Sequence, residues 1–439
     1  MAESITTFDK ISGDLTGHIK TTKWFMIWMT FLSACLLVCL YAYTRQLRYG
    51  LGVAGIRDYV SWGMYISNFV FFVATSLIGM LISGVLGLIG IKWITPIARI
   101  AEIIAVAFAA VAGIVIVSDM GRPERLLYVF IYGRFQSPIL WDVTVVTTYF
   151  VLSLLLYYLM LIPDLAVLSK KANLLPSWLR PVYKALAMNF SNKPAQSAII
   201  RRSIRILLLM LIPAAFSIHT VTSWLFAMTL RAGWDSSIFG PYFVSGAFVA
   251  GCAAVIIAMF FFRKNYKLDN YITDFHFNKM AVLLVLVSFV YLYFNLNEYL
   301  VPAYKLKRNE ALDLHAILVG RHAFLFWSVQ LGGLVLPIIL MLFRSLRKPL
   351  PAMLISVAVL AGAWFKRYLI VVPTQEHPFL PIQHVPQSFH YYTPTLTETA
   401  ISIAPFIMVL MIITLLAKFF PVVPVVETAE EKGIHPYDI

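Results

Sequence analysis

A histidine and an aspartate stand out because both are ionisable and both belong to long apolar runs. His219 lies in "FSIHTVTSWLFAM", and no other histidine lies as deep within such a run. Asp142 follows Ser137-Pro138 at the start of another run. Ionisable side chains in apolar segments are costly and are functional candidates by default. An imidazole and a carboxylate together can exchange protons by general acid–base chemistry, so this pair is the first candidate site.

Each of these residues also has a structural explanation. Asp142 could cap its own helix, because acids stabilise helix N-termini, and a lone buried histidine is often a hydrogen-bonded core residue. A haem held by two histidines needs both at similar depth, and His322, the one candidate partner, lies nearer the surface. Three cysteines without a CxxC motif predict neither an iron–sulfur cluster nor a structural zinc. We therefore expect no haem, iron–sulfur cluster or other metal centre in this chain.

The composition excludes an ordinary soluble protein. Of 439 residues, 60% are hydrophobic and 13% are charged, whereas soluble domains carry about 25% charged residues. The net charge of +14 does not predict a nucleic-acid partner, because basic residues of membrane proteins usually collect in cytoplasmic loops. The composition predicts an integral membrane protein in contact with lipid.

Ten apolar segments have the length of about 20 residues that a helical span requires. They are residues 24–43, 60–90, 97–118, 139–162, 204–229, 241–262, 279–301, 321–343, 351–372 and 398–420. An even number of spans places both termini on one side, and the loops of that side hold more Lys and Arg. Both termini are therefore expected in the cytoplasm, and the fold class is all-α and polytopic.

With this orientation, most polar residues of the spans lie toward the outer side. The outward group comprises Asp58, Tyr59, Trp62, Asn68, Asp142, His219, Glu298, Arg321, His322, Lys366, Arg367 and Glu398, and the inward group comprises Arg99, Glu102 and His276. Four of the outward residues, Glu298, Arg321, Lys366 and Glu398, are close enough to span ends to reach the headgroups instead. A quinone suits this location, because its ring carbonyls need hydrogen-bond donors and a proton-exchanging group in an apolar slot open to lipid.

Four stretches of the sequence resemble one family of membrane subunits. They are "DMGRPERLLYVFIYGRFQSPILWD" (119–142), "WGMYISNFVFFVATSLIGMLIS" (62–83), "IHTVTSWLFAMTLRAGWDSSIFGPYFVSGAF" (218–248) and "FKRYLIVVPT" (365–374). In their order along the chain they resemble the NrfD/PsrC family. This family includes ten-span members in alternative complex III, in Qrc- and Dsr-type complexes, and in polysulfide or tetrathionate reductases.

The resemblance implies an architecture and a set of partners. Family members have two four-helix bundles, here spans 2–5 and 6–9, with spans 1 and 10 beside them. They bind a quinone (menaquinone or ubiquinone) near the outer face of a bacterial or archaeal cytoplasmic membrane. There they dock an iron–sulfur protein, which exchanges electrons with a further subunit such as a multihaem cytochrome c or a molybdopterin enzyme.

The implied domain organisation divides the chain into five parts. They are a cytoplasmic tail (1–23), the first span and outer loop (24–59), a first bundle with a basic inner loop at 163–203 (60–229), a second bundle with an outer loop at 373–397 (230–397), and the last span with its tail (398–439). The basic inner loop is expected along the cytoplasmic headgroups, and the outer loop, rich in Pro, His and aromatic residues, is expected to dock a partner.

The predicted roles follow from combining depth with the resemblance. Asp142 and His219 are expected to handle quinol protons. The quinone pocket is assigned to Tyr59, Trp62, Asn68, Asp119, Arg122 and Trp141, and partner docking to Glu124, Arg125 and Arg134. A candidate proton path comprises Glu102, Glu298, Arg321, His322, Arg367 and Glu398. Many relatives have Glu-Arg where this chain has Lys366-Arg367, which puts a carboxylate route at that position in doubt.

The sequence leaves two other functions open. A structural anchor would hold a complex together without its own quinone site, and its polar residues would serve interfaces. A secondary transporter would place polar residues near the bilayer midplane beside broken helices, but here they lie toward one end of the spans. The depth of the polar residues therefore favours a quinone-reactive subunit of a multi-subunit oxidoreductase.

Overall fold

Helices make up the whole regular structure of the described residues. The computed structural model describes residues 2–19, 22–171, 174–229, 231–380 and 382–434, and within them ten helical segments are long and apolar enough to span a membrane. They are α2 (Lys23–Tyr49), α3 with a following π-helix (Met64–Leu86), α4 (Thr95–Asp119), α6 (Pro138–Lys170), α8 (Pro194–Ala227), α9 (Phe239–Tyr266), α10 (Asp274–Lys305), α12 with α13 (Ala323–Leu342), α14 (Pro349–Glu376) and α15 (Leu396–Phe419). The prediction of a ten-span, all-α membrane protein is confirmed.

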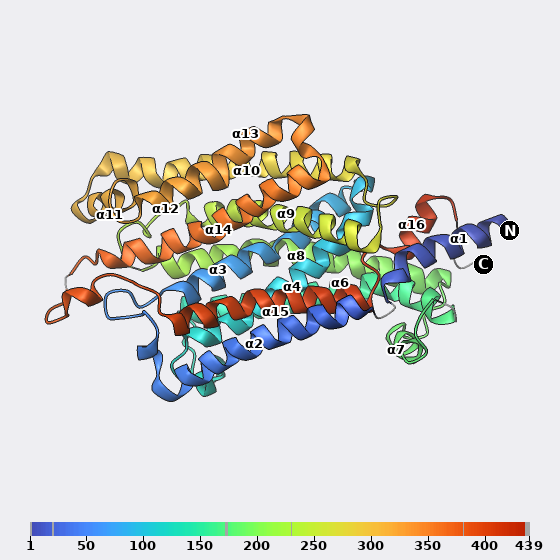
Figure 1. Ribbon diagram of the computed structural model, residues 1–439, viewed down its shortest axis with the longest axis horizontal. Coiled ribbons are helices and arrows are strands. Elements are labelled where there is room, and N and C mark those ends of the chain that lie inside the picture. Colours follow the sequence, from blue (N-terminus) through green and yellow to red (C-terminus); the bar gives the residue numbers. More distant parts are fainter. Residues whose placement is uncertain (1, 20–21, 172–173, 230, 381, 435–439) are drawn as a thin grey trace.

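The long helices run side by side along the molecule, and neighbours in sequence are often neighbours in space (Figure 1). Contacts link α3 to α4, α4 to α6, and α6 to α8; a second set links α9 to α10 and α14, and α14 to the helix of span 8. The two sets meet where α9 packs on α3, α4 and α8, and α14 packs on α3. The first and last spans, α2 and α15, pack on each other, and α15 also contacts α4.

The second span begins later than the sequence predicts. Its helix starts at Met64 rather than near residue 60, so Tyr59 and Trp62 belong to the preceding connection. The side chain of Gln375 explains this difference: its Oε1 accepts from the Trp62 backbone N–H at 3.1 Å and its Nε2 donates to the Trp62 carbonyl at 2.8 Å. Because both peptide groups are satisfied by this side chain, the segment needs no helix to hydrogen-bond its backbone.

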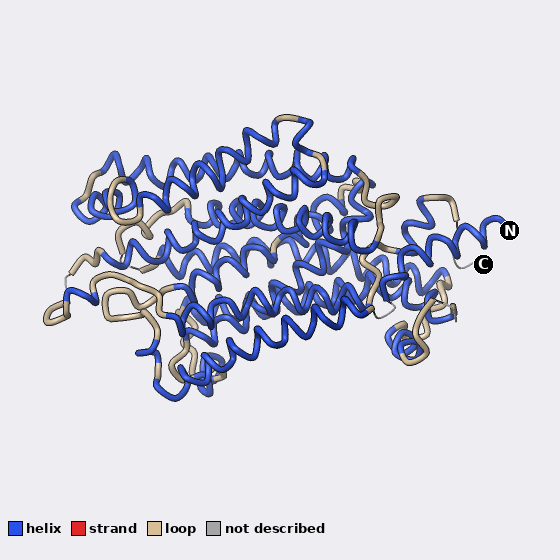
Figure 2. Tube along the Cα trace, in the orientation of Figure 1, coloured by secondary structure: helices blue, strands red, loops and turns tan. Residues whose placement is uncertain are grey.

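The basic connection at 163–203 is largely helical in its described part. α6 continues to Lys170, α8 begins at Pro194, and a short helix, α7 (Leu179–Leu186), lies between them. Figure 2 shows how little of the molecule is loop, and most of the loop lies at the two ends of the long helices. The connection therefore has a defined shape rather than being an extended linker.

α1 (Ala2–Thr16) and α16 (Val425–Glu431) pack on each other at one end of the molecule (Figure 1). We call this the terminal end, and the opposite end the far end. α16 is held by Asp164 of α6, whose carboxylate accepts from the Val425 and Val426 backbone N–H groups at 3.1 and 2.8 Å. The same carboxylate forms a buried ion pair with Arg99 of α4.

Replacing Asp164 with Asn should destabilise the protein strongly. The substitution keeps the shape but leaves the buried Arg99 charge without a counter-charge, which costs about 3–5 kcal/mol. Thermal unfolding of the purified protein in detergent measures this as a lower midpoint. The control is Asp9→Asn, which removes an exposed ion pair with Lys171 worth less than about 1 kcal/mol. Equal midpoints for the two variants would contradict the role assigned to Asp164.

Candidate functional site

Asp142 and the face of α8 that carries His219 meet near the far end. The Thr222 hydroxyl donates to Asp142 Oδ1 at 2.5 Å across the α6–α8 contact. His219 precedes Thr222 by three residues, so both point from the same face of α8. All three side chains are buried, and His219 Nε2 has no hydrogen-bond partner among the described residues. A buried ring nitrogen without a partner, one helical turn from the residue that contacts a buried carboxylate, can bind an oxygen atom of a ligand and exchange a proton with it.

The hydrogen bond of Asp142 also decides between two explanations for this acid. A helix cap would accept from backbone N–H groups in the first turn of α6. The observed bond instead crosses to α8, and the N-cap residue of α6, Ser137, makes no side-chain capping bond in the described structure. The position of Asp142 therefore depends on the packing of two helices rather than on its own helix terminus.

Aromatic side chains pack together near the start of α6 and the end of α8. Trp141, next to Asp142, packs edge-on against Trp224 of α8 with ring centroids 6.2 Å apart, and Trp224 is exposed on the outside of the helices. Trp62 stacks on Trp234 and packs edge-on against Phe226 of α8, each at 5.8 Å. Both groups of rings therefore belong to the same end of α6 and α8 as the candidate site.

Two residues predicted for the quinone pocket, Tyr59 and Asn68, form hydrogen bonds away from the contact between α6 and α8. Tyr59 stacks on His390 at 4.2 Å, and its hydroxyl bonds the backbone of Ile382. The Asn68 amide lies between Trp364 of α14 and the Ser402 carbonyl of α15. The Tyr59 contacts join the far-end loop to the connection before α3, and the Asn68 contacts join α3 to α14 and α15. None of these partners belongs to α6 or α8.

The loop between α4 and α6 is charged and open. Arg122, Glu124, Arg125 and Arg134 are exposed, and none of them forms an ion pair within the described residues. Asp119, at the end of α4, is largely buried, and its Oδ1 has no hydrogen-bond partner in the part of the chain that is described. The four exposed charges are available to a molecule outside the chain, whereas Asp119 points into the interior.

A belt of polar contacts closes the far end near residues 373–398. Glu376 lies 3.0 Å from His322 Nε2 and 4.0 Å from Arg321, and it accepts from the Tyr392 backbone N–H. Glu398 accepts from the Gly55 N–H at 2.7 Å and from the Tyr392 hydroxyl. Arg321, His322 and Glu398, predicted for a proton path, therefore tie this loop to its neighbours.

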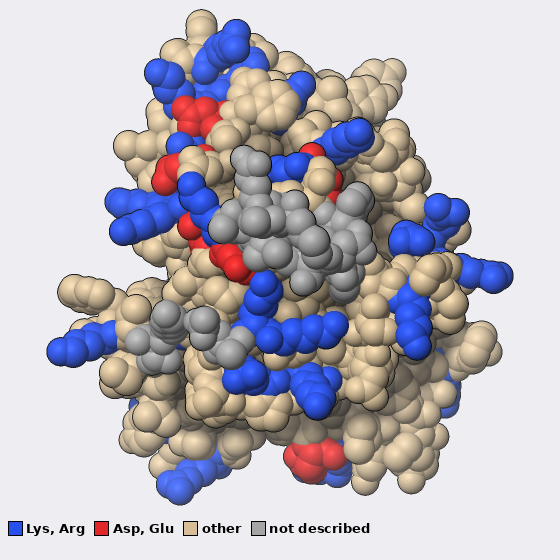
Figure 3. All heavy atoms as spheres, turned by 90° about the vertical axis from the view of Figure 1, so that its right-hand side faces the viewer, with Lys and Arg blue, Asp and Glu red and all other residues tan. Residues whose placement is uncertain are grey.

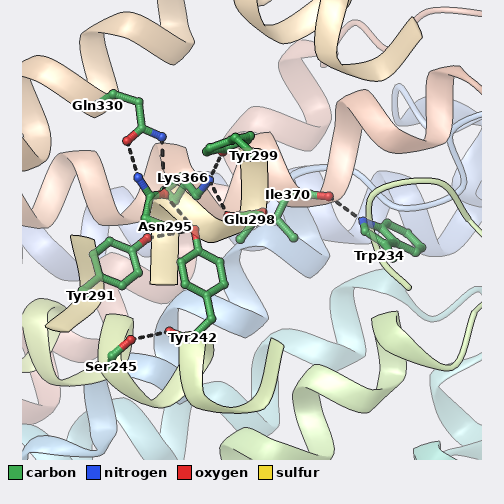
Figure 4. Close-up of polar contacts among 10 residues, drawn as sticks. All are labelled: Trp234, Tyr242, Ser245, Tyr291, Asn295, Glu298, Tyr299, Gln330, Lys366 and Ile370. Carbon is green, nitrogen blue, oxygen red and sulfur yellow. Dashed lines mark hydrogen bonds and ion pairs between the residues drawn. The ribbon is translucent and has the colours of Figure 1, made fainter. Parts of the chain in front are cut away.

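A second buried polar network connects α9, α10, α14 and the span-8 helix (Figure 4). Lys366 forms an ion pair with Glu298 at 3.1 Å and also contacts the Tyr299 hydroxyl. Next to it, the Tyr242 hydroxyl donates to Asn295 Oδ1 at 3.1 Å and lies 3.2 Å from the Tyr291 hydroxyl. Asn295 Nδ2 donates to Gln330 Oε1 at 2.6 Å. Lys366 is thus held by a carboxylate and a tyrosine hydroxyl of α10.

The sequence did not indicate the neutral members of this network. Tyr242, Tyr291, Asn295 and Gln330 carry no charge, and a search for ionisable groups passes over them. Their signal was the occurrence of an Asn and a Gln within apolar runs, because such amides usually hydrogen-bond across helices. The helix of Gln330 is π-helical over Ser328–Val335, and Gly333 there meets Gly362 of α14 so closely that a Cβ on either would lie under 3 Å from the other.

Two other buried groups lack partners within the described chain. The Arg367 guanidinium lies over the Phe243 ring at 5.5 Å, and its Nε and Nη2 have no hydrogen-bond partner there. It lines a small cavity together with Tyr291, Asn295 and Gln330. Nearer the terminal end, neither carboxylate oxygen of Glu102 has a partner among the described residues. Both residues were predicted for a proton path, and both are polar groups that burial alone does not stabilise.

At the far end, α11 (Arg308–Leu318) contributes Glu310 and Asp313 to a recess that also includes Glu298 and Tyr299. Asp313 Oδ1 is buried without a hydrogen-bond partner in the described structure. Burial, followed by the charges of Glu298 and Glu376, raises the pKa of Asp313 to about 7. This aspartate therefore takes up a proton in a pH range where an ordinary aspartate is ionised.

A comparison with models of protein families identifies the family of this chain. The model of the polysulphide reductase NrfD family matches residues 52–378. The chain belongs to this family. The match includes α3 to α14 and so contains Asp142, His219 and the second polar network, and it confirms the resemblance seen in the sequence.

Three relatives of this NrfD-family chain are components of reductases by name. One, from the selenate reductase of Mesobacillus selenatarsenatis, is 23% identical, over 90% of the chain and 94% of the relative. The integral membrane subunit of the menaquinone reductase of Nitratidesulfovibrio vulgaris is 23% identical, over 91% and 92%. A protein of Halobacterium salinarum, provisionally named as a membrane subunit of dimethyl sulfoxide reductase, is 30% identical over 52% of the chain and 50% of its own length.

The Lys366–Glu298 pair should behave as a coupled unit. Lys366→Met alone leaves a buried carboxylate without its counter-charge and should cost about 3–5 kcal/mol. The double variant Lys366→Met, Glu298→Gln removes both charges and should recover most of that loss. Thermal unfolding midpoints of the wild type, both single variants and the double variant provide the cycle. Additive effects of the two substitutions would show that the pair is not coupled.

Asp313 should make stability depend on pH. Its native pKa of about 7 exceeds the ordinary value of about 4, so between these values the native state binds more protons than the unfolded state. The contribution is therefore greatest at low pH and is lost as pH rises through 7. The thermal midpoint of the wild type should fall between pH 5 and pH 8 more steeply than that of Asp313→Asn. Parallel curves for the two proteins would refute this assignment.

Proposed function

We propose that this chain is the quinone-reactive membrane subunit of a multi-subunit oxidoreductase, with its site between α6 and α8. The observation that carries the proposal is His219 Nε2, a buried ring nitrogen without a hydrogen-bond partner in the described chain, one turn from the residue that holds Asp142. A quinone oxygen fits this atom chemically, since a carbonyl accepts a hydrogen bond from imidazole and a quinol hydroxyl donates one to it.

The quinone supplies the two-electron chemistry when it is bound, and the chain supplies positions for its protons. In this proposal His219 binds one ring oxygen and exchanges its proton. Asp142, oriented by Thr222, accepts the proton released at His219 and passes it toward the far end. Trp141 and Trp224 border the entry from the lipid side.

The names of the relatives support a redox role for this chain and a quinone as its electron carrier. The name of the Nitratidesulfovibrio vulgaris relative states a menaquinone reductase, and that of the Mesobacillus selenatarsenatis relative a selenate reductase. We infer a quinone of the menaquinone or ubiquinone class for this chain. Its electrons pass to or from an iron–sulfur protein at the far end, which connects to a further subunit such as a multihaem cytochrome c or a molybdopterin enzyme.

The exposed charges of Arg122, Glu124, Arg125 and Arg134 support docking at the far end. With this assignment the far end faces outward and the terminal end faces the cytoplasm. Figure 3 shows Lys and Arg side chains over much of the terminal face, as expected for a cytoplasmic surface. The chain is thus assigned to a bacterial or archaeal cytoplasmic membrane with both termini inside.

The second polar network adds a candidate route for protons. Arg367 of α14 packs on Phe243 of α9 and lines the small cavity with Tyr291, Asn295 and Gln330. From Arg367 the cavity residues lead to Lys366 and Glu298, and from there to the recess of Asp313. We include proton translocation along this network, with Glu102 toward the terminal end, in the proposal.

Asp142→Asn and His219→Gln test the proposal. Loss of a positioned proton-exchanging group lowers rates by about 100-fold or more, so quinol turnover by the purified complex should fall by that factor. The assembled complex should keep its elution volume on size-exclusion chromatography. The matched control is His315→Gln, an exposed histidine of α11, which should keep wild-type turnover.

The main competing function is a structural anchor. It receives support from Tyr59, Asn68 and Glu398, whose hydrogen bonds all fasten loops or spans together. If Asp142→Asn and His219→Gln assemble normally and turn over quinol at the wild-type rate, the anchor replaces the proposed function. Thr222→Val, which removes the donor to Asp142, should give a smaller loss than Asp142→Asn.

A further inference from the structure

A basic surface surrounds α7 at the terminal end, on the side of the molecule away from the candidate quinone site. The chain has no Asp or Glu between Asp164 and Asp235. Six basic residues of this stretch, Arg180, Lys184, Lys193, Arg201, Arg202 and Arg205, form no ion pair within the described residues. Their charge is therefore uncompensated by the described part of the protein.

α7 is fixed crosswise to the spans. Figure 1 shows it nearly end-on while the long helices run across the view. One face is anchored, because Leu179 and Tyr183 are buried and the Tyr183 hydroxyl donates to the Phe419 carbonyl of α15 at 2.6 Å. The Tyr158 hydroxyl of α6 donates to the Leu186 carbonyl at 2.7 Å. A helix held in this direction lies parallel to the membrane plane.

The other face of α7 combines apolar and basic side chains. Trp178 is 58% exposed and Val182 is 43% exposed, and Lys184 is exposed beside them. Arg180 is half-buried, and its Nε has no hydrogen-bond partner among the residues described. Exposed tryptophan with adjacent basic residues is the composition of helices at the membrane–water interface, and the unpartnered guanidinium N–H requires an acceptor.

The start of α8 marks the depth of the headgroups. Arg201, Arg202 and Arg205 are exposed, and Arg201 and Arg205 are four residues apart, so they share one face of the helix. One turn further, Leu209 and Met210 are 57% and 50% exposed. Beyond Arg205 the exposed side chains of α8 are uncharged and mostly apolar, and we take this change as the boundary between phosphate groups and acyl chains.

We propose that α7 and the first turns of α8 bind anionic phospholipids of the terminal-end leaflet. The phosphate groups are held by Arg180 and Lys184 of α7 and by Arg201, Arg202 and Arg205 of α8. The acyl chains lie against Trp178 and the exposed apolar face of α8. Charge complementarity selects an anionic lipid, since a zwitterionic headgroup leaves the excess positive charge uncompensated.

Native mass spectrometry of the purified complex tests this proposal with two probes, dioleoyl-phosphatidylglycerol and dioleoyl-phosphatidylcholine. The wild type should retain phosphatidylglycerol in preference to phosphatidylcholine. The triple variant Arg201→Gln, Arg202→Gln, Arg205→Gln should lower phosphatidylglycerol retention by about a hundredfold, because each basic residue near an anionic headgroup contributes on the order of 1 kcal/mol and about 1.4 kcal/mol corresponds to a factor of ten. Arg180→Gln, Lys184→Gln forms an independent second variant.

The control removes basic residues at the other end of the molecule. Arg45 and Arg48 are exposed on the far-end turns of α2, and Arg45→Gln, Arg48→Gln should retain phosphatidylglycerol like the wild type. Equal retention of the two lipids by the wild type, or wild-type retention by both test variants, would overturn the proposal. So would displacement of the lipid by an equal concentration of inorganic phosphate. Quinol turnover, measured in parallel, separates this result from that of the α6–α8 site.

Discussion

A charge buried among apolar helices persists only beside an opposite charge or strong hydrogen-bond donors, and this constraint organises the protein. Asp164 meets it with Arg99 and two backbone N–H groups, and thereby fixes α16 at the terminal end. Lys366 meets it with Glu298, and thereby joins α14 to α10. In each case one ion pair holds parts of the chain together that are distant in sequence.

The same constraint makes the exceptions informative. His219 Nε2, the Glu102 carboxylate and two Arg367 nitrogens are buried without hydrogen-bond partners in the described residues. Most buried polar atoms in proteins are satisfied by protein or water, so these unsatisfied groups in the helical interior mark places where another molecule or water belongs. His219 is one helical turn from the residue that contacts Asp142, Arg367 lines a small cavity, and Glu102 lies toward the terminal end.

The sequence predicts what depends on length and depth, and fails where rotation of a helix decides. Ten apolar segments of sufficient length predict ten spans, and depth along them places Asp142 and His219 toward the same end of the spans. Depth along a span does not predict that Asn68 hydrogen-bonds to α14 and α15, because the side chains of one helical turn point in every direction around the helix axis. The contact of Thr222 with Asp142 and the network of Tyr242 and Asn295 likewise depend on rotations that only packing determines.

Glu398 joins two segments that are more than 300 residues apart in sequence. Its carboxylate accepts from Gly55, in the connection after α2, and from Tyr392, in the connection before α15. Gly55 approaches the Thr393 carbonyl so closely that no side chain larger than hydrogen fits there without a shift. The two connections are therefore fastened to each other through one carboxylate, and loss of Glu398 would release both ends of the chain's outermost helix pair, α2 and α15, from one another at this point.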